Sequence, residues 1–173
     1  MRLLILASYN KNRYAPFIVE QAEALAKQGC QIEWFGVQGK GLVGYLRNLP
    51  RLRKQIKSFC PDVIHAHYGL SCLLANMATR SVPVVSTYHG SDINLPKVRR
   101  LSKIAMRLSA WNIFVSKRNM ALANAEEGKK CSLIPCGVAL SDDQLQSQEE
   151  ARRALGWGTS EKKVLFAGAF DNT

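Results

Sequence analysis

Three sequence motifs of nucleotide-binding and metal-binding proteins are lacking. The loop expected after the first strand, YNKNRYAP, contains no glycine, so the G-x-G-x-x-G fingerprint of nicotinamide enzymes does not occur there. No G-x-x-x-x-G-K-[ST] segment occurs, which argues against a nucleoside triphosphatase. The five cysteines form no C-x-x-C pair, and their number is odd. This usage is typical of a reduced, cytoplasmic chain with inert thiols rather than a disulfide framework or a metal site.

Long apolar runs are also lacking. No segment approaches the ~20 apolar residues of a transmembrane helix. The first residues, MRLLILAS, superficially resemble a signal peptide, but the apolar run is short and the polar residues 9–13 follow at once. We therefore interpret this run as a buried first strand.

Acidic residues are scarce in most of the chain. Residues 1–125 contain 18 Lys and Arg against 5 Asp and Glu, whereas the remainder contains 6 against 8, and the formal net charge is +11. An excess of this size implies an anionic partner, namely nucleic acid, a membrane surface or a phosphorylated substrate. Helix-turn-helix, RNA-recognition and zinc-knuckle patterns do not occur, so we expect no nucleic-acid partner.

Short apolar runs alternate with helical patterns along the chain. We expect strands at residues 2–7, 30–37, 63–65, 83–88, 110–115, 131–135 and 163–168. We expect helices at residues 16–29, 46–59, 70–79, 97–109, after 116 and at 147–155, with Pro50 kinking or dividing the second. This alternation with short loops predicts an α/β fold, a doubly wound parallel sheet of the Rossmann-like kind.

The segment that ends the sequence differs from the rest. The strand expected at 163–168 has no helix after it, and it follows a polar stretch where the charge changes sign. We expect an amino-terminal Rossmann-like domain at 1–140, then a linker helix and the first strand of a second domain at 141–173. An apolar strand without its own sheet is a pairing hazard. Residues 163–173 are therefore expected to be disordered, to pack in trans or to form a dimer contact.

Two polar clusters follow neighbouring expected strands: His67-Tyr68-Gly69 and His89-Gly90-Ser91-Asp92. Ligands of open α/β sheets bind at the carboxyl ends of the strands, so these clusters are the candidate site. We expect His65 to be a buried, hydrogen-bonded histidine that points to the face opposite His67, so that the two form no metal pair. His67 is expected to face the cleft. Purely structural roles remain open for His89 as a loop cap and for Asp92 as a turn cap.

Positive charge also surrounds this region. Ser116 is a plausible helix N-cap, and Lys117 would add a charge at the same rim. In the helix at 97–109, the apolar side is expected to contain Val98, Leu101, Ile104, Ala105 and Leu108, and the basic side Arg99, Arg100, Lys103 and Arg107. A basic amphipathic helix is typical of a membrane-surface patch, although a solvated helix face explains it equally well.

Six segments in order resemble one family. They are PFIVEQAEALAKQG at 16–29, PDVIHAH at 61–67, the T-x-HGSD segment at 87–92, FVSK at 114–117, IPCGV at 134–138 and VLFAGAF at 164–170. The sequence is similar to the amino-terminal, acceptor half of a family 4 (group 1) retaining glycosyltransferase with the two-domain GT-B fold.

The resemblance implies an enzyme of the hexosyltransferase type. A sugar would pass from a nucleotide-diphosphate sugar to an acceptor hydroxyl with retention, without a metal or cofactor. By resemblance, His89 contacts the transferred sugar. The acceptor side would contain Tyr9, Asn10, Arg13, His67 and Tyr68, and the donor side of the cleft Gly90, Asp92, Ser116 and Lys117. The acceptor would be a glycan, a lipid-linked sugar or a polysaccharide precursor, and the protein would work in the cytoplasm, peripherally at the inner membrane face.

Two departures from the family pattern qualify these expectations. The loop after the first strand lacks the glycines that approach donor phosphates in many relatives. The Arg/Lys pair and the Glu-x7-Glu segment of the family's carboxyl-terminal domain do not occur, so this chain alone is expected to be inactive or nearly so. The alternatives are a basic α/β binding module for an anionic membrane or nucleic acid, and a sugar-nucleotide epimerase, against which the missing glycine fingerprint argues.

Overall fold

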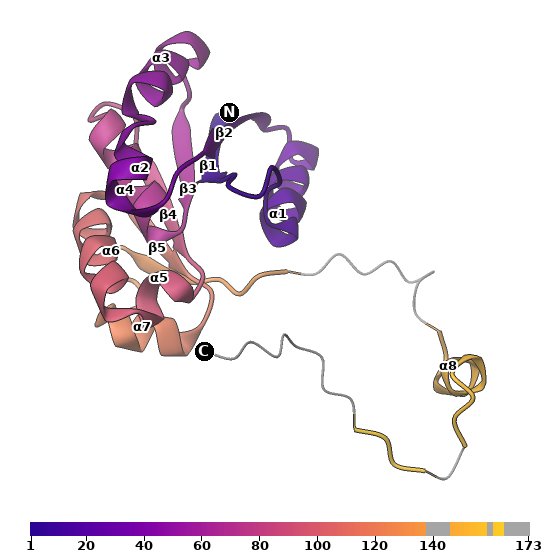
Figure 1. Ribbon diagram of the computed structural model, residues 1–173. Coiled ribbons are helices and arrows are strands. Elements are labelled where there is room, and N and C mark those ends of the chain that lie inside the picture. The colour runs from indigo at the N-terminus through magenta and orange to yellow at the C-terminus, as the bar shows by residue number, and fades with distance from the viewer. Residues whose placement is uncertain (138–145, 159–160, 165–173) are drawn as a thin grey trace. The chain divides into compact units, whose positions relative to one another are not determined.

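The computed structural model describes residues 1–137, 146–158 and 161–164 (Figure 1). The chain divides into two compact units, Met1–Val138 and Ala139–Thr173. All the residues of the candidate site lie in the first unit.

The first unit is built on a six-stranded parallel sheet with the order β2-β1-β3-β4-β5-β6. The strands are β1 (Arg2–Ser8), β2 (Gln31–Val37), β3 (Val63–His67), β4 (Val84–Tyr88), β5 (Trp111–Phe114) and β6 (Cys131–Leu133). Residues 3–7 of β1 are all buried, as expected for a strand covered on both faces. The predicted doubly wound α/β fold is confirmed.

Helices connect the strands, and most of them match predicted segments, but the two short helices at 41–46 and 91–94 were not predicted. The helices are α1 (Pro16–Lys27), α2 (Gly41–Leu46), α3 (Leu49–Phe59), α4 (Gly69–Ala78), α5 (Ser91–Asn94), α6 (Pro96–Leu108) and α7 (Lys117–Ala123). Pro50 lies in the first turn of α3, so the pattern at 46–59 belongs to two helices. Pro16 and Pro96 likewise begin α1 and α6, where a missing N–H costs nothing.

The two faces of the sheet are covered differently (Figure 1). Leu3 and Ile5 of β1 pack with Ile18 of α1 in the smaller core cluster. Alternate residues of the same strand, Leu4 and Leu6, belong to the larger cluster, which extends over α3, α4 and α6. The chain first crosses from β1 to β2 and then reverses towards β3. The carboxyl ends of β1 and β3 therefore form the topological switch point, where open α/β sheets bind their ligands.

Close packing between α4 and α6 holds the switch point on one side. Gly69 begins α4 against Ser102 of α6: a Cβ at Gly69 would lie 1.9 Å from Ser102 Oγ. Ser102 Oγ donates to the Asp92 carbonyl at 2.8 Å. The turn after β3 is thus fixed to the segment after β4.

The second unit contains α8 (Gln148–Ala154). Ser147 and Glu150 form a capping box, in which each side chain satisfies a backbone N–H of the other. Lys163 and Val164 are not in a strand. The rest of the strand expected at 163–168, and with it most of the expected dimer contact, lies outside the described residues.

Candidate functional site

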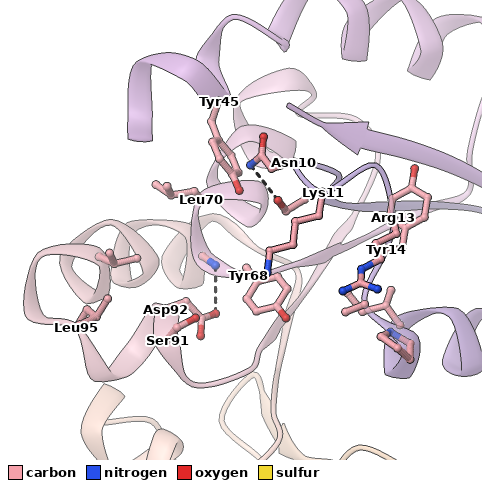
Figure 2. Close-up of a pocket in the computed structure, with 16 residues that line it drawn as sticks. Asn10, Lys11, Arg13, Tyr14, Tyr45, Tyr68, Leu70, Ser91, Asp92 and Leu95 are labelled. Atoms are coloured by element: carbon pink, nitrogen blue, oxygen red, sulfur yellow. Dashed lines mark hydrogen bonds between the residues drawn. The ribbon is translucent and has the colours of Figure 1, made fainter. Parts of the chain in front are cut away.

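A pocket of about 610 Å³ opens at the switch point (Figure 2). Its walls are the loop after β1, the first turn of α1, one residue of α2, the first turn of α4 and the segment from α5 into α6. The lining side chains combine cations, tyrosines and aliphatic groups: Asn10, Lys11, Arg13, Tyr14, Ile18, Tyr45, Tyr68, Leu70, Asp92, Leu95 and Val98. The pocket opens at the sheet edge where the sequence placed the candidate site, but His67, His89 and Gly90 do not line it. The sequence did not indicate Lys11, Tyr14 or Tyr45.

Hydrogen bonds from Asn10 hold the loop after β1. Its Nδ2 donates to Ser8 Oγ at 3.1 Å and to the Gly39 carbonyl at 3.0 Å, and its Oδ1 accepts from Gly39 N at 2.7 Å. Tyr9 packs against the sheet. A Cβ at Gly36 of β2 would lie 2.7 Å from Tyr9 Cβ, and the ring centroids of Tyr9 and Tyr14 are 4.7 Å apart. Tyr9 supports the pocket wall rather than lining it.

Two cations reach into the pocket from this loop. Figure 2 shows the side chains of Lys11 and Arg13 extending into the space beside Tyr68. Both residues are exposed. Neither takes part in the ion pairs of the described residues, which join Lys129 to Glu126 and Lys163 to Glu161. The pocket therefore presents positive charge.

Tyr68 forms the floor of the pocket in an unusual backbone conformation. Its φ is +69° and its ψ is 141°, and it directly precedes α4. A bulky residue with positive φ is rare and costs of order 1–3 kcal/mol, so the surrounding contacts must enforce it. Its N–H donates to the Thr87 carbonyl at 3.0 Å, and its ring lies 4.8 Å from that of His89. The strained turn aligns one tyrosine with both the pocket and His89.

The Asp92 carboxylate organises the backbone around the pocket. Oδ1 accepts from His89 N at 3.1 Å and Gly90 N at 2.8 Å, and Oδ2 accepts from Gly69 N at 3.1 Å. Burial raises the pKa of Asp92, and these backbone hydrogen bonds oppose that effect. Gly90 adopts a φ of +132°, which side-chain-bearing residues rarely do. Asp92 thus caps the turn, one of the roles that the sequence allows for it, and its carboxylate oxygens are occupied by backbone N–H groups.

The three histidines of the sequence gather beside the pocket. Ring centroids lie 4.3 Å apart for His65 and His67, and 5.3 Å apart for His67 and His89. His65 Nε2 is 2.8 Å from Thr87 Oγ1, and His67 Nδ1 is 3.1 Å from His89 Nε2. The expectation of a buried, hydrogen-bonded His65 is confirmed.

Two expectations about these histidines were wrong. His65 and His67 point to the same face of the sheet, because side chains alternate along a strand and residues two apart share a face. His67 does not face a cleft, since its relative exposure is 0%. The end of β3 is covered by His89, which stacks over it from the loop after β4. His67 therefore supports the site from beneath.

Burial sets the charge state of this cluster. Desolvation lowers the pKa of His89 to about 4. Desolvation and, to a lesser extent, the charge of His89 lower the pKa of His65 to about 4, and desolvation holds that of His67 well below its usual value. All three rings are therefore neutral near pH 7. His89 also packs on Phe17 at 4.7 Å, and its Nδ1 is 3.8 Å from Cys136 Sγ, a neighbour that the sequence did not indicate.

The other two residues expected on the donor side, Ser116 and Lys117, follow β5. Ser116 caps α7, since its Oγ accepts from Asn119 N at 3.2 Å, so the predicted N-cap is confirmed. Lys117 is the first residue of α7 and is exposed. Because β5 is parallel to β4, both residues lie at the same edge of the sheet as His89. They do not line the pocket.

The exposed face of α6 differs from the prediction. Ile104 and Leu108 are 46% and 56% exposed instead of buried, because the buried face is centred on Ser102 and Ala105. Arg99 is half-buried, and its Nη1 lies 3.4 Å from the Leu122 carbonyl. Lys103 is also half-buried, whereas Arg100 and Arg107 are exposed. The face open to solvent therefore mixes arginines with aliphatic side chains.

The described residues contain no group of three or more His, Cys, Asp or Glu placed to hold a metal ion. Within the same part of the chain, the helices are too short or too polar to cross a membrane.

Known proteins match both the sequence and the fold. The profile of Glycosyltransferase Family 4 matches residues 15–142. A curated relative, described as the putative teichuronic acid biosynthesis glycosyltransferase TuaC of Bacillus subtilis (strain 168), is 32% identical over 124 residues, which cover 62% of this chain and 30% of that protein.

Solved structures share the fold at low sequence identity. Sucrose-phosphate synthase from Thermosynechococcus elongatus gives a TM-score of 0.67 at 14% identity, covering 93% of this chain and 54% of that one. HepE from Anabaena, solved in complex with UDP, gives a TM-score of 0.58 at 15% identity, covering 90% and 50%. The chain thus spans about a third of the curated relative and about half of these solved chains.

Proposed function

Because the chain belongs to glycosyltransferase family 4, we propose that it is the acceptor-binding part of an enzyme that transfers a sugar from a nucleotide-diphosphate sugar to an acceptor hydroxyl. The observation that carries this proposal is the pocket at the switch point, beside His89. Its tyrosines offer flat apolar faces with hydroxyl tips, which suit a sugar ring. Its volume lies within the usual range for small-molecule sites.

The donor is proposed to be a nucleotide sugar, and two observations bear on where it is held. The HepE structure, which shares this fold, was solved with UDP. Among the described residues, the loop after β1 offers no glycine for close approach to a diphosphate. We therefore propose that another domain holds most of the donor, and that this chain alone binds sugar nucleotides weakly and transfers little or no sugar. Transfer proceeds with retention and without a metal or cofactor in this proposal.

His89 is proposed to contact the transferred sugar as a neutral ring. A pKa of about 4 leaves it uncharged near pH 7, so it can donate or accept a hydrogen bond but cannot provide a cation. Gly90 and Asp92 fix the backbone on which it is carried. Ser116 and Lys117 lie at the same edge and are proposed for the donor side of the cleft.

The activity test needs a polypeptide that joins this chain to the carboxyl-terminal domain of the family. Release of nucleoside diphosphate from a panel of sugar nucleotides is measured with acceptor glycans present. The variant His89→Ala is expected to lower turnover about 100-fold, a loss typical of removing one group that stabilises the transition state. Turnover near the parent value with an unchanged melting temperature would show that His89 is structural.

Calorimetry tests the division of labour between the domains. This chain is titrated with UDP-glucose and GDP-mannose, and we expect no binding or millimolar binding. Micromolar binding of either nucleotide would show that the donor is held here.

A membrane-adjacent acceptor is the second element of the proposal. The face of α6 that is open to solvent combines Arg100 and Arg107 with Ile104 and Leu108. Basic residues attract an anionic bilayer surface, and exposed aliphatic residues insert at its boundary. Peripheral contact of this kind would bring the pocket to a lipid-linked or surface-polysaccharide precursor on the cytoplasmic side of the inner membrane.

A further inference from the structure

Among the described residues, the cations of the pocket have no partner that neutralises their charge. The lining residues include two cations, Lys11 and Arg13, and one acid, Asp92. The acid cannot compensate for them, because its oxygens accept three backbone N–H bonds and it is only 3% exposed. Neither cation makes an ion pair or a side-chain hydrogen bond within the described part of the chain. Their N–H donors, about five on Arg13 and three on Lys11, therefore remain free for a ligand.

The loop is built to present these cations. Asn10 ties it to Gly39 through two hydrogen bonds, and Asn12 N donates to the Tyr9 carbonyl at 3.1 Å. Asn12 has a φ of +53°, a conformation that asparagine tolerates better than most residues. The backbone on which Lys11 and Arg13 stand is thus fixed, which lowers the entropy lost when a ligand orders their side chains.

Aromatic rings surround the same space. Tyr68 lies beneath the Lys11 side chain and Tyr45 lines the pocket from α2 (Figure 2), and Tyr14 lines it beside Arg13. Tyr14 is itself braced by Trp34, with ring centroids 4.4 Å apart. A ligand that fits must therefore combine a ring for the tyrosines with negative charge for the cations. A neutral glycan could pack on the tyrosines but would leave the charges of Lys11 and Arg13 without a counter-ion.

We propose that the acceptor carries an oxyanion, the carboxylate of a uronic acid or a phosphate on the sugar, which Lys11 and Arg13 bind while its sugar ring packs on the tyrosines. This inference rests on the proposed function, since it names the chemical class of the acceptor. The guanidinium of Arg13 can hold either oxyanion through two parallel hydrogen bonds. Lys11 adds a mobile point charge on a flexible stem.

The test is a titration of the 173-residue chain followed by NMR. The probes are a disaccharide ending in glucuronic acid, the same disaccharide ending in glucose, glucose 1-phosphate and UDP. The uronate or the sugar phosphate is expected to bind at least tenfold more tightly than the neutral disaccharide, with shifts at Tyr45 and Tyr68. Raising the salt concentration should reduce this preference, because the cations are exposed. Comparing the two charged probes distinguishes carboxylate from phosphate.

A matched pair of double variants isolates the two cations. Lys11→Gln/Arg13→Gln should bring the charged probes to the affinity of the neutral disaccharide. Lys54→Gln/Lys57→Gln removes the same charge from exposed positions of α3 and should leave the preference intact. Both variants change exposed side chains, so their spectra should show an unchanged fold.

The other outcomes separate this inference from the proposed function. Equal affinity for charged and neutral disaccharides would overturn the anionic acceptor and leave the acceptor pocket standing. UDP bound through Lys11 and Arg13 more tightly than either charged sugar would overturn it by assigning the cations to the donor. Failure of every saccharide to shift the pocket residues would overturn both proposals.

Discussion

His67 and His89 share one hydrogen bond, and its direction determines what His89 offers to a ligand. Both rings are neutral near pH 7, so only one of the two facing nitrogens carries the proton. If His89 donated, His67 would bury an N–H at Nε2 that has no acceptor within the described structure. If His67 donates, only a lone pair is left without a partner. Buried donors without a partner are rarer than unsatisfied acceptors, so the second arrangement is favoured. His89 then presents Nδ1–H towards Cys136 and the open side.

This arrangement predicts one tautomer of His89. Long-range ¹H–¹⁵N correlation spectra resolve the two ring nitrogens, and the sequence contains only three histidines. We expect His89 to be the Nδ1–H tautomer in the parent chain and a mixture of tautomers in His67→Leu. His67→Asn keeps an N–H donor and should restore the single tautomer. An Nε2–H tautomer in the parent chain would contradict the proposed direction.

The lowered histidine pKa values also predict how stability changes with pH. The unfolded chain binds protons at its histidines below pH ~6.5, whereas folded His65 and His89 bind them only near pH 4. Protons therefore favour the unfolded state, and stability falls as the pH is lowered from 6.5 to 4. A shift of this size amounts to about 3 kcal/mol for a single histidine.

Urea unfolding at pH 7 and pH 4.5 measures this loss. His65→Gln can keep the hydrogen bond to Thr87 but cannot take up a proton. The pH dependence should therefore be weaker in this variant than in the parent chain. The carboxylates, including Asp92 with its raised pKa, contribute equally to both proteins and cancel in the comparison. If stability fell equally between pH 7 and pH 4.5 in the two proteins, His65 would have the same pKa in the folded and unfolded states.

At the scale of elements, the site depends on how closely α4 approaches α6. The sequence predicted both helices and placed Ala105 of α6 on its apolar side correctly. It also placed Ile104 and Leu108 there, which are exposed, and it did not indicate that Ser102 is buried. The buried face of α6 contains small residues because Gly69 allows the α4 backbone to pack directly on Ser102. Periodicity measures apolar character and does not detect a contact made by small polar residues.

Gly69→Ala should disrupt this contact. The new Cβ would lie 1.9 Å from Ser102 Oγ and 2.9 Å from its Cβ, so α4 and α6 must separate. Overpacking of this kind costs about 1–3 kcal/mol, which a urea denaturation curve detects. The second-site change Ser102→Gly should recover part of the loss. Gly137→Ala serves as the control, since no atom of the described residues lies within 4 Å of its added Cβ. Equal stability of Gly69→Ala and the parent chain would contradict direct packing.

At the scale of the molecule, the fold could be predicted because each strand and helix carries its own local signal. The apolar run of β1 and the prolines that begin α1 and α6 are examples. The location of the site followed from one rule about parallel sheets. Its contents did not follow, because Lys11, Tyr45 and Leu95 are far apart in the sequence and meet only through the topology. Burial of His67 was missed for the same reason, since the residue that covers it comes from the next loop.

The excess of positive charge gives a prediction for the whole chain. Vesicles of phosphatidylcholine containing phosphatidylglycerol should co-sediment with the protein, whereas pure phosphatidylcholine vesicles should not. Each Lys or Arg near an anionic bilayer contributes about 1 kcal/mol, so Arg100→Gln/Arg107→Gln should weaken binding roughly thirtyfold. The exposed aliphatic residues of α6 allow a second test that leaves the charge unchanged. Ile104→Ser/Leu108→Ser should also weaken binding, because the apolar area available for insertion is lost.

The control for vesicle binding is Lys54→Gln/Lys57→Gln on α3, which lowers the net charge by the same amount as the α6 arginine variant. If the whole charge of the chain attracts the membrane, both charge variants should lose affinity equally. If the face of α6 makes the contact, only the α6 variants should do so, and their residual binding should disappear first as salt is raised. Equal losses of vesicle affinity in the α3 and α6 charge variants would indicate a diffuse electrostatic attraction and no docking face. Vesicle binding that none of the variants alters would exclude α6 from the contact.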